Sequence, residues 1–576
     1  MIDLKYSEIL AQNNLLRESI SGNKYTISIL ANVTVNPLIE LIEYSCRLQN
    51  INPLVKIGNY DNIAQDCTTH SNSDLVLVFY DIFKLINELP FFFEDISEDM
   101  LLGLKDRIYS EFDIIYKNLE NCPSVVINTF SSEYFTKGYA GNSKIELFVF
   151  ELNLHMSQKL SKNVSFINLN TIFSTIGIHQ AIDYRLYSAS KSLYTIAFFK
   201  YYIQALEPTL LRNTGKLKKA IIFDCDNTLW NGILGEDGFS GIDMSLKSSK
   251  GIVFNKIQQI ARYLSNNGVI VGLCSKNNES DVFDVINNHS DMVLKDDNIV
   301  IKKINWKDKA TNLIDIAKEL NIGQDSIVFV DDSDFEINLI NEKVPEIKTI
   351  RVPNNLLDYP KIVLDNIFKY FNLSVSNEDR LKTKMYKQQA KRIESKSNTE
   401  SIEDYLKSLD ISVKVFENDE SLVSRISQMT QKTNQFNLTT QRYTENQISS
   451  FIINNDSSIF AISVSDKFGD NGITGTLICN FDKSSKIVII DTFLMSCRII
   501  GRNIEFVFFD FFVKKIIKKG YSIIKASYIP TKKNEQVKEL YETFGFEISY
   551  IENEKKEYVL NIANYKKKNL DYIKIN

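Results

Sequence analysis

The sequence predicts an α/β protein of three domains, two built on mostly parallel sheets and the last of the α+β class. Three observations support this prediction. The chain has 576 residues, which is too many for one hydrophobic core. Up to about residue 372, short apolar runs alternate with longer amphipathic stretches, as in βαβ units. Beyond a polar stretch, strands and helices mix without that alternation.

The first predicted domain covers residues 1–213. Its apolar runs are "YTISILA", "LVLVFY", "SVVINTF" and "VSFINLN". Each suits a buried strand, and the stretches between them suit amphipathic helices. We therefore expect a mostly parallel sheet with helices on its faces.

The second predicted domain covers residues 214–372 and repeats the pattern with sharper strands: "AIIFD", "VIVGLCS", "SIVFVDD" and "KTIRV". Residues 373–405 are polar and rich in Lys, Gln and Ser, which predicts a linker helix followed by a hinge. The third domain, 406–576, mixes strands such as "FAISVSD" and "KIVIIDTFLMS" with helices such as "IEFVFFDFFVKKIIKKG". That mixture is typical of an α+β domain.

Composition excludes several classes of protein. Hydrophobic residues make up 44% and charged residues 24%, as in ordinary globular proteins, and the net charge of -5 gives no reason to expect a nucleic-acid partner. The start of the chain lacks the pattern of a signal peptide, and the most apolar segment is too short and too charged to span a bilayer. The seven cysteines are scattered without metal-type spacing, which favours a reduced, cytoplasmic protein.

Polar side chains follow three strands of the second domain. Asp224 and Asp226 follow "AIIF", Ser275 ends "VIVGLC", and Asp331 and Asp332 end "SIVFV". In open α/β sheets, ligands bind beyond the carboxyl ends of the strands, where these residues are expected to meet.

A lysine is expected at the same edge of the sheet. In "KATNLIDIAKELNIG" the apolar positions share one helical face, with Gly323 as the stop, and Lys309 falls in the first turn. Lys302, Lys303 and Lys307 lie close by in the sequence and remain alternatives to Lys309.

This set suits phosphoryl transfer with a metal. Asp224 can attack phosphorus and form an aspartyl phosphate, while Asp226 exchanges protons with the leaving oxygen and the incoming water. Asp224, the backbone of Asp226 and Asp331 are the expected Mg²⁺ ligands, with Asp332 competing with Asp331. Ser275 and Lys309 would hold the phosphoryl oxygens.

The four elements "DCDNT", "LCSKN", the lysine and "VDDSD" resemble, in order, the motifs of the haloacid dehalogenase superfamily. The resemblance implies a Rossmann-like domain and an Mg²⁺-dependent phosphatase. Only the short flap "WNGILGEDGFSG" follows the first motif, so no large cap domain fits. We expect an open site unless another domain covers it, which favours a substrate shared between domains or carried on a partner.

In the last domain, "FLMSCRIIGRNIEF" predicts a strand, then Ser496 and Cys497, then a turn with Gly501 that opens a helix. Backbone amides at a helix start can receive a pyrophosphate or a phosphopantetheine phosphate. The stretch resembles the R/Q-x-x-G-x-G/A loop of GNAT-type acyltransferases, with Asn503 where a small residue is usual. The resemblance implies that Arg498, Gly501 and Arg502 receive a phosphopantetheine thiol, of a carrier protein or of coenzyme A, as the acyl acceptor.

Two further stretches of this domain have distinctive sequences. "KNEQVKELYETFGFE" is similar to the end of GNAT domains, where a helix packs a tyrosine near the thioester and "GF" begins the last strand. "SRISQMTQKTNQFNLTTQRYTENQI" is dense in Gln, Asn and Thr and, taken alone, predicts an amide-rich loop with capping threonines.

The combination of "FDCDNTLWNGILGEDG", "QKTNQFNLTTQRYT", "DKFGDNGITG" and "FLMSCRIIGR" resembles the FkbH-like proteins, in which such a phosphatase is fused to an acyltransferase-like domain. The resemblance implies that a small acyl phosphate, such as 1,3-bisphosphoglycerate, loses phosphate and that its glyceryl unit passes through an enzyme thioester to an acyl carrier protein. The first domain resembles the SGNH-hydrolase-like domain of longer members, with Asn32 at the serine position. His179 completes no convincing triad and is expected to be a packing or capping residue, so we expect a non-hydrolytic binding or lid element.

Some alternatives stay open at this point. Cys497 is the first candidate for the thioester, because it lies at a strand end beside the phosphopantetheine-type loop and near Arg498 and Arg502. Cys225 lies between two carboxylates that would raise its pKa and make it a poor nucleophile. The alternative for Cys497 is a small buried apolar residue. The acceptor could be a sugar or a surface-polysaccharide precursor instead of a carrier protein. A catalytically silent scaffold is the third interpretation, and four intact residues argue against it: Asp224, Asp226, Ser275 and Asp331.

Overall fold

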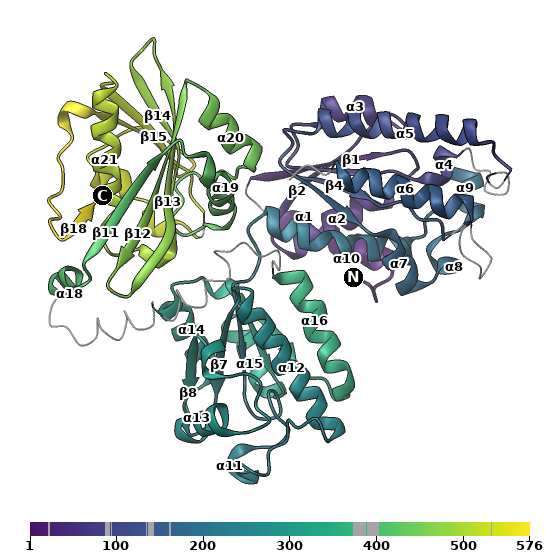
Figure 1. Cartoon of the computed structure of the whole chain (residues 1–576), viewed down its shortest axis with the longest axis horizontal. Helices are drawn as coiled ribbons and strands as arrows, with labels where there is room; N and C mark the ends of the chain where they lie inside the picture. The colour runs from purple at the N-terminus through teal and green to yellow at the C-terminus, as the bar shows by residue number, and fades with distance from the viewer. Residues whose placement is uncertain are drawn as a thin grey trace. The chain divides into compact units, whose positions relative to one another are not determined.

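The computed structural model describes residues 1–20, 23–86, 93, 95–133, 135, 143–159, 163–371, 388, 402–531 and 533–576, with the side chains of 402, 403, 405 and 497 left aside. The chain divides into two compact units, residues 1–214 with 443–447, and residues 215–442 with 448–576. Three separate sheets are present among the described residues (Figure 1). The linker helix and hinge expected at 373–405 lie almost wholly outside the described residues, and the predicted domain limits stay a prediction.

The first sheet has five strands in the order β2-β1-β3-β4-β5, and every neighbouring pair is parallel, as predicted. Its strands are β1 (Lys24–Ala31), β2 (Asn52–Ile57), β3 (Leu75–Phe79), β4 (Val125–Asn128) and β5 (Val164–Ile167). β3 and β4 are buried along their whole length, which explains why they are continuous apolar runs in the sequence.

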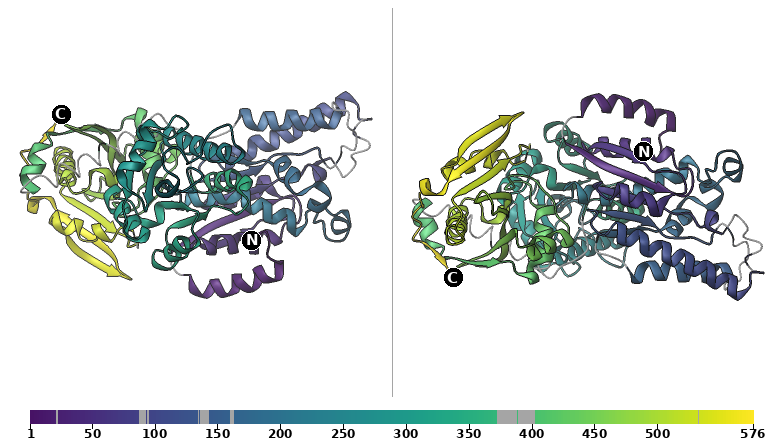
Figure 2. Two further views of the ribbon diagram at one scale, coloured as in Figure 1. Left: turned by 90° about the horizontal axis from the view of Figure 1, so that it is seen from below. Right: turned by 90° about the horizontal axis from the view of Figure 1, so that it is seen from above.

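Helices cover both faces of this sheet. They are α1 (Tyr6–Ser19), α2 (Pro37–Leu48), α3 (Ile63–His70), α4 (Ile82–Leu85), α5 (Glu98–Asn118), α6 (Lys144–Gln158), α7 (Leu169–Ile176), α8 (Ile178–Ala181), α9 (Tyr184–Ser190) and α10 (Ile196–Asn213). α2 packs against α1 and α10, whereas α5 packs against α3 and α6. Figure 2 shows the purple α1 and the blue α5 and α6 on opposite sides of the sheet.

Asn32, the residue that the resemblance was expected to place at a serine position, has a structural role in the first sheet. Its amide nitrogen donates to the carbonyl of Asp81 over 2.8 Å, and its amide oxygen accepts from the backbone nitrogen of Asp81 over 2.7 Å. Both residues are buried. Asn32 therefore joins the ends of β1 and β3. His179 is exposed on α8, so it does not pack in the core, and the capping role that was the other expectation stays a prediction.

The second sheet also has five parallel strands, in the order β10-β9-β6-β7-β8. The strands are β6 (Ala220–Phe223), β7 (Ile270–Ser275), β8 (Ile301–Ile304), β9 (Ile327–Asp331) and β10 (Lys348–Arg351). The helices are α11 (Leu234–Asp237), α12 (Ser249–Asn266), α13 (Glu279–Asn288), α14 (Lys309–Leu320), α15 (Asp334–Lys343) and α16 (Tyr359–Tyr370). α12 packs against α16, and α14 packs against α15.

The structure confirms the apolar face predicted for α14 but not Gly323 as the residue that ends the helix. Leu313, Ile316 and Leu320 are buried on that face. The helix ends at Asn321, whose backbone is left-handed with a φ of 50°, whereas Gly323 is extended. Asn tolerates the left-handed conformation because its short side chain can hydrogen-bond locally, so no glycine is needed at this position.

The third sheet has eight strands in the order β16-β17-β15-β14-β13-β12-β11-β18. They are β11 (Ile411–Glu417), β12 (Ser457–Asp466), β13 (Gly469–Asp482), β14 (Ile487–Met495), β15 (Ile523–Tyr528), β16 (Glu547–Glu552), β17 (Lys555–Asn561) and β18 (Ile573–Ile575). All pairs are antiparallel except β14 with β15 and β11 with β18.

The helices of this region are α18 (Ile402–Ser408), α19 (Val423–Lys432), α20 (Glu445–Ile453), α21 (Ile504–Lys518) and α22 (Leu540–Thr543). The amide-rich stretch is therefore helical in part, because α19 and the start of α20 belong to it. β17 and β18 follow β16, so "GF" does not begin the last strand. Among the described helices, none is long and apolar enough to cross a membrane.

Candidate active site

The carboxylates predicted from strand ends meet at one edge of the second sheet. Asp224 directly follows β6, Ser275 ends β7 and Asp331 ends β9. β6 lies between β7 and β9, and all three strands run parallel. Their carboxyl ends therefore converge, as expected for an open α/β sheet.

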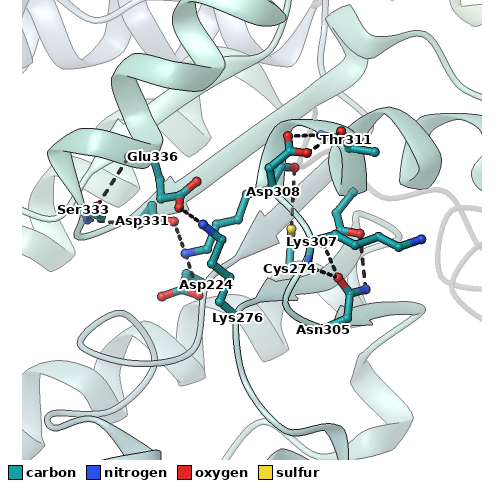
Figure 3. A network of polar contacts seen from close by, with 12 residues as sticks. Asp224, Cys274, Lys276, Asn305, Lys307, Asp308, Thr311, Asp331, Ser333 and Glu336 are labelled. Atoms are coloured by element: carbon teal, nitrogen blue, oxygen red, sulfur yellow. Dashed lines mark hydrogen bonds and ion pairs between the residues drawn. The ribbon is translucent and has the colours of Figure 1, made fainter.

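Lys309 joins two of these carboxylates. Its Nζ lies 3.0 Å from Oδ1 of Asp224 and 2.6 Å from Oδ2 of Asp331, and all three side chains are buried. Asp308 caps α14 by accepting from the backbone nitrogen of Thr311, which sets Lys309 as the first residue of the helix. Figure 3 shows the polar network around Asp224 and Asp331.

In the described contacts, the side chains of the three competing lysines do not pair with Asp224 or Asp331. Figure 3 includes Lys307 because its backbone nitrogen donates to Oδ1 of Asn305. Lys302 pairs with Asp296, and Lys303 pairs with Glu319. Lys307 is exposed. The structure thus brings Lys309, of the four candidates, to the strand-end carboxylates.

Three carboxylates form a set that could hold a metal ion. Oxygens of Asp224, Asp331 and Asp332 all lie within 4.8 Å of one another. Lys309 is the one cation that the described contacts place between Asp224 and Asp331, so three negative charges face one positive charge. A divalent cation would balance that excess, and carboxylate oxygens are the ligands that Mg²⁺ prefers. The residues present therefore fit Mg²⁺, and both Asp331 and Asp332 belong to the set.

The pKa values reflect the same crowding of charge. Burial raises the pKa of Asp224 to about 6, against the opposing effect of Lys309. Burial also raises the pKa of Asp331, and burial with the charge of Asp224 raises the pKa of Asp332. Burial alone would lower the pKa of Lys309, but the two carboxylates outweigh it and raise that pKa.

Asp226 is held in one orientation by three donors. Its Oδ1 accepts from Nε1 of Trp230 over 2.9 Å and from the backbone nitrogen of Leu234 over 3.0 Å. Its Oδ2 accepts from Nδ2 of Asn277 over 2.8 Å, and the same amide group also contacts Oγ of Ser275 over 3.2 Å. The Asp226 carboxylate is not one of the three that share the metal set, so its expected metal contact would come from its backbone.

Sequence reasoning gave no role to Trp230, Asn277 or Glu336. Glu336 is buried on α15 and pairs with Lys276 over 2.6 Å, beside Asp224 and Asp331 in Figure 3. Asn277 lies two positions after Ser275, so its closeness to a strand end was the signal that could have indicated it. Trp230 carried no such signal, because its contact with Asp226 depends on the fold of the loop after β6.

The loop between β14 and α21 contains the residues expected to bind phosphopantetheine. Nη1 of Arg502 pairs with Oδ2 of Asp466 over 2.8 Å, and Nη2 donates to the carbonyl of Arg498. Nε of Arg498 donates to Oγ of Ser496 over 3.2 Å. Both arginines are buried, and Gly501 has a φ of +80°. The guanidinium of Arg502 therefore makes internal contacts with the protein.

Two cysteines are candidates for the thioester. Cys497 begins the short helix η6 (Cys497–Ile499), and its side chain lies outside the described part of the structure, so its role stays a prediction. Cys225 is buried, and burial followed by the charge of Asp224 raises its pKa well above the usual value. That direction agrees with the expectation that Cys225 is a poor nucleophile.

No protein-family model matches the chain, and no curated protein matches it. Among solved structures, it is similar to the N-terminal part of the protein BF1531 from Bacteroides fragilis, which contains a phosphatase domain and was crystallised with Mg. The TM-score is 0.56 at 23% identity, and the match covers 64% of this chain and 99% of that one. At this identity the similarity shows a shared fold.

Two acetyltransferases are also similar to a smaller part of the chain. The ribosomal-protein-S18-alanine N-acetyltransferase from Escherichia coli is 11% identical with a TM-score of 0.21, and the match covers 26% of this chain and 94% of that one. A mutant spermidine/spermine N-acetyltransferase SpeG from Vibrio cholerae is 12% identical with a TM-score of 0.22, over 27% of this chain and 95% of that one. At these TM-scores neither similarity bears on function.

Proposed function

We propose that the chain is an Mg²⁺-dependent phosphatase of a small phosphorylated acyl compound, joined to an acyltransferase that passes the acyl group through a thioester on Cys497 to an acyl carrier protein. The observation that carries the phosphatase half is the buried cluster of Asp224, Lys309 and Asp331, with Asp226 held beside it. The similarity to a chain described as containing a phosphatase domain complexed with Mg supports the same half.

Each residue at the edge of the second sheet then has a defined task. An oxygen of Asp224 attacks phosphorus, the bond from phosphorus to the leaving oxygen breaks, and Asp226 gives that oxygen a proton. Asp226 next takes a proton from water, whose oxygen attacks the aspartyl phosphate and releases inorganic phosphate. Lys309 and Ser275 hold the phosphoryl oxygens. When bound by Asp224, Asp331 and Asp332, Mg²⁺ would supply positive charge against those oxygens.

The proposed substrate, 1,3-bisphosphoglycerate, carries two phosphates of different chemistry, and we assign one to the Cys497 site and the other to the Asp224 site. Its carboxyl phosphate is an activated acyl group, so hydrolysis there would leave a carboxylate that cannot acylate a thiol. We therefore assign that bond to the Cys497 thiolate, which attacks the carbonyl carbon and expels phosphate with its electron pair. The other phosphate is an ester of an alcohol, whose poor leaving oxygen needs the proton that Asp226 supplies.

Metal binding tests the phosphatase half. Mg²⁺ should raise the melting temperature of the protein and should be required for phosphate release, which excess chelator should abolish. Because the metal-free pKa of Asp224 is about 6, protons compete with the ion below that pH. The apparent Kd for Mg²⁺ should rise by up to about tenfold per pH unit from about pH 6 to 5, measured by calorimetry. Phosphate release that persists in chelator would contradict the metal assignment.

We expect the loss of Asn277 to slow phosphate release most for substrates with poor leaving groups. Asn277→Ala removes the donor to Oδ2 of Asp226, the oxygen that Trp230 and Leu234 do not bind, and so loosens the orientation of that carboxylate. We expect kcat/KM for an alkyl phosphate to fall by about 10² while that for p-nitrophenyl phosphate changes little, because a nitrophenolate leaves without a proton.

The neighbouring Asn278→Ala, at an exposed position, is the matched control for this variant and should match the wild type. An equal loss for both substrates in Asn277→Ala would show that Asn277 supports the fold and does not position Asp226.

A further inference from the structure

β14 and β15 separate after a short common stretch. They pair in parallel over Ile487–Ile489 and Ile523–Lys525, whereas β14 stays paired with β13 up to Met495. Beyond Ile489, the β14 edge that faces β15 therefore needs another partner. Such an opening between two strands presents backbone N–H and C=O groups to any extended chain that enters it.

The chain fills this opening with its own segment Phe436–Leu438, here called the insert. Met495 N donates to Phe436 O over 2.9 Å, and Leu438 N donates to Phe493 O over 3.2 Å. On the other side, Ile529 N donates to Leu438 O over 2.8 Å. The insert thus bonds to β14 and to the residue that follows β15, as a strand between them would.

Side chains hold the insert in place. Asn534, fully buried, donates from Nδ2 to the carbonyl of Asn437 over 2.8 Å. Oδ1 of Asn437 accepts from the backbone nitrogen of Thr440 over 2.9 Å. Phe436 and Leu438 are buried in the core of the domain, and the ring centroids of Phe436 and Phe493 lie 5.8 Å apart in an edge-to-face arrangement. The insert is therefore built into the core.

The insert occupies the path that a pantetheine arm would need. A phosphate received by the loop Arg498–Asn503 would leave its arm running back along the adjoining end of β14. The arm is an extended chain with two amides, and it would bind through the backbone groups at 493–495. Met495 N and Phe493 O are already bonded to the insert, and the guanidinium of Arg502 pairs with Asp466. The residues present do not fit a pantetheine arm in this opening.

We infer that the insert permanently closes the opening between β14 and β15, so that the C-terminal domain binds no coenzyme A there and draws its acyl group from an acyl phosphate. The inference that the opening is closed follows from the contacts described above. The inference that an acyl phosphate is the donor rests on the proposed function. A carrier-protein thiol must then reach Cys497 by a route outside this opening.

Hydrogen exchange of the full chain tests the closure. Without ligand, the amides of Leu438, Met495 and Ile529 should exchange slowly, and coenzyme A at about 1 mM should neither change their exchange nor give a calorimetric signal. Asn534→Ala should speed exchange over 434–440 by roughly tenfold, because it removes a buried hydrogen bond to the insert. Asn569→Ala, at an exposed asparagine of the same domain, should leave that exchange unchanged.

Fast exchange of the insert in the wild type, or its displacement by coenzyme A with micromolar affinity, would overturn the closure. The identity of the acyl donor is tested in a separate experiment. Acyl transfer from an acetyl-CoA but not from an acyl phosphate would refute the inferred donor. A protein that releases no phosphate and forms no thioester would refute the proposed function, while the exchange data would still decide the closure.

Discussion

Asp224→Asn should lower kcat for phosphate release by at least about 10³-fold while the protein stays folded. The amide has nearly the shape of the carboxylate but cannot attack phosphorus. Lys309 keeps its contact with Asp331 at 2.6 Å, so the substitution leaves no unpaired buried ammonium. Steady-state phosphate release and thermal melting on the same preparation measure the two effects.

Asp334→Asn is the matched control, because Asp334 lies just after the neighbouring strand β9 but is exposed and pairs with Arg351 at the surface. Its activity should stay close to that of the wild type, since surface ion pairs contribute little. Full activity of a well-folded Asp224→Asn protein would refute the assignment of Asp224 as the nucleophile.

Cys497→Ser should abolish the covalent adduct that the wild type forms with an acyl phosphate. Incubation with 1,3-bisphosphoglycerate is expected to add the mass of a phosphoglyceryl or glyceryl group, and hydroxylamine should remove it because it cleaves thioesters. Phosphate hydrolysis at Asp224 should persist in Cys497→Ser, since Asp224 follows a strand of the second sheet and Cys497 follows a strand of the third, so the two residues can fail separately. Intact-protein mass spectrometry and a phosphate assay measure these outcomes.

Cys225→Ser serves as the comparison. Burial and the charge of Asp224 disfavour its thiolate, so this variant should keep the adduct. Cys479, a buried cysteine whose pKa burial raises to about 12, provides a second variant that should also keep it. An adduct that survives Cys497→Ser and disappears in Cys225→Ser would move the acyl group to the phosphatase domain and refute the assignment of Cys497.

The residues of the phosphatase site could be predicted from the sequence because each one is tied to a local pattern. Asp224, Ser275 and Asp331 end apolar runs that are buried strands, and Lys309 begins a helix with a regular apolar face. Local pattern decides strand ends and helix starts, and parallel strands bring their carboxyl ends to one edge. The sequence by itself therefore determined which side chains can meet there.

Only the tertiary structure decided which groups pair with which. Four lysines lie close together in the sequence, and the fold brings the start of α14, where Lys309 lies, to the carboxylates at the ends of β6 and β9. The insert shows more clearly that pairing cannot be predicted from local sequence, because its residues "FNL" lie in an amide-rich stretch without a strand pattern. Its hydrogen bonds go to Phe493, Met495 and Ile529, which are more than fifty residues away in the sequence. Every residue offers similar backbone hydrogen-bonding groups, so the local sequence does not specify a long-range partner. The packing of the whole sheet sets which backbone groups pair.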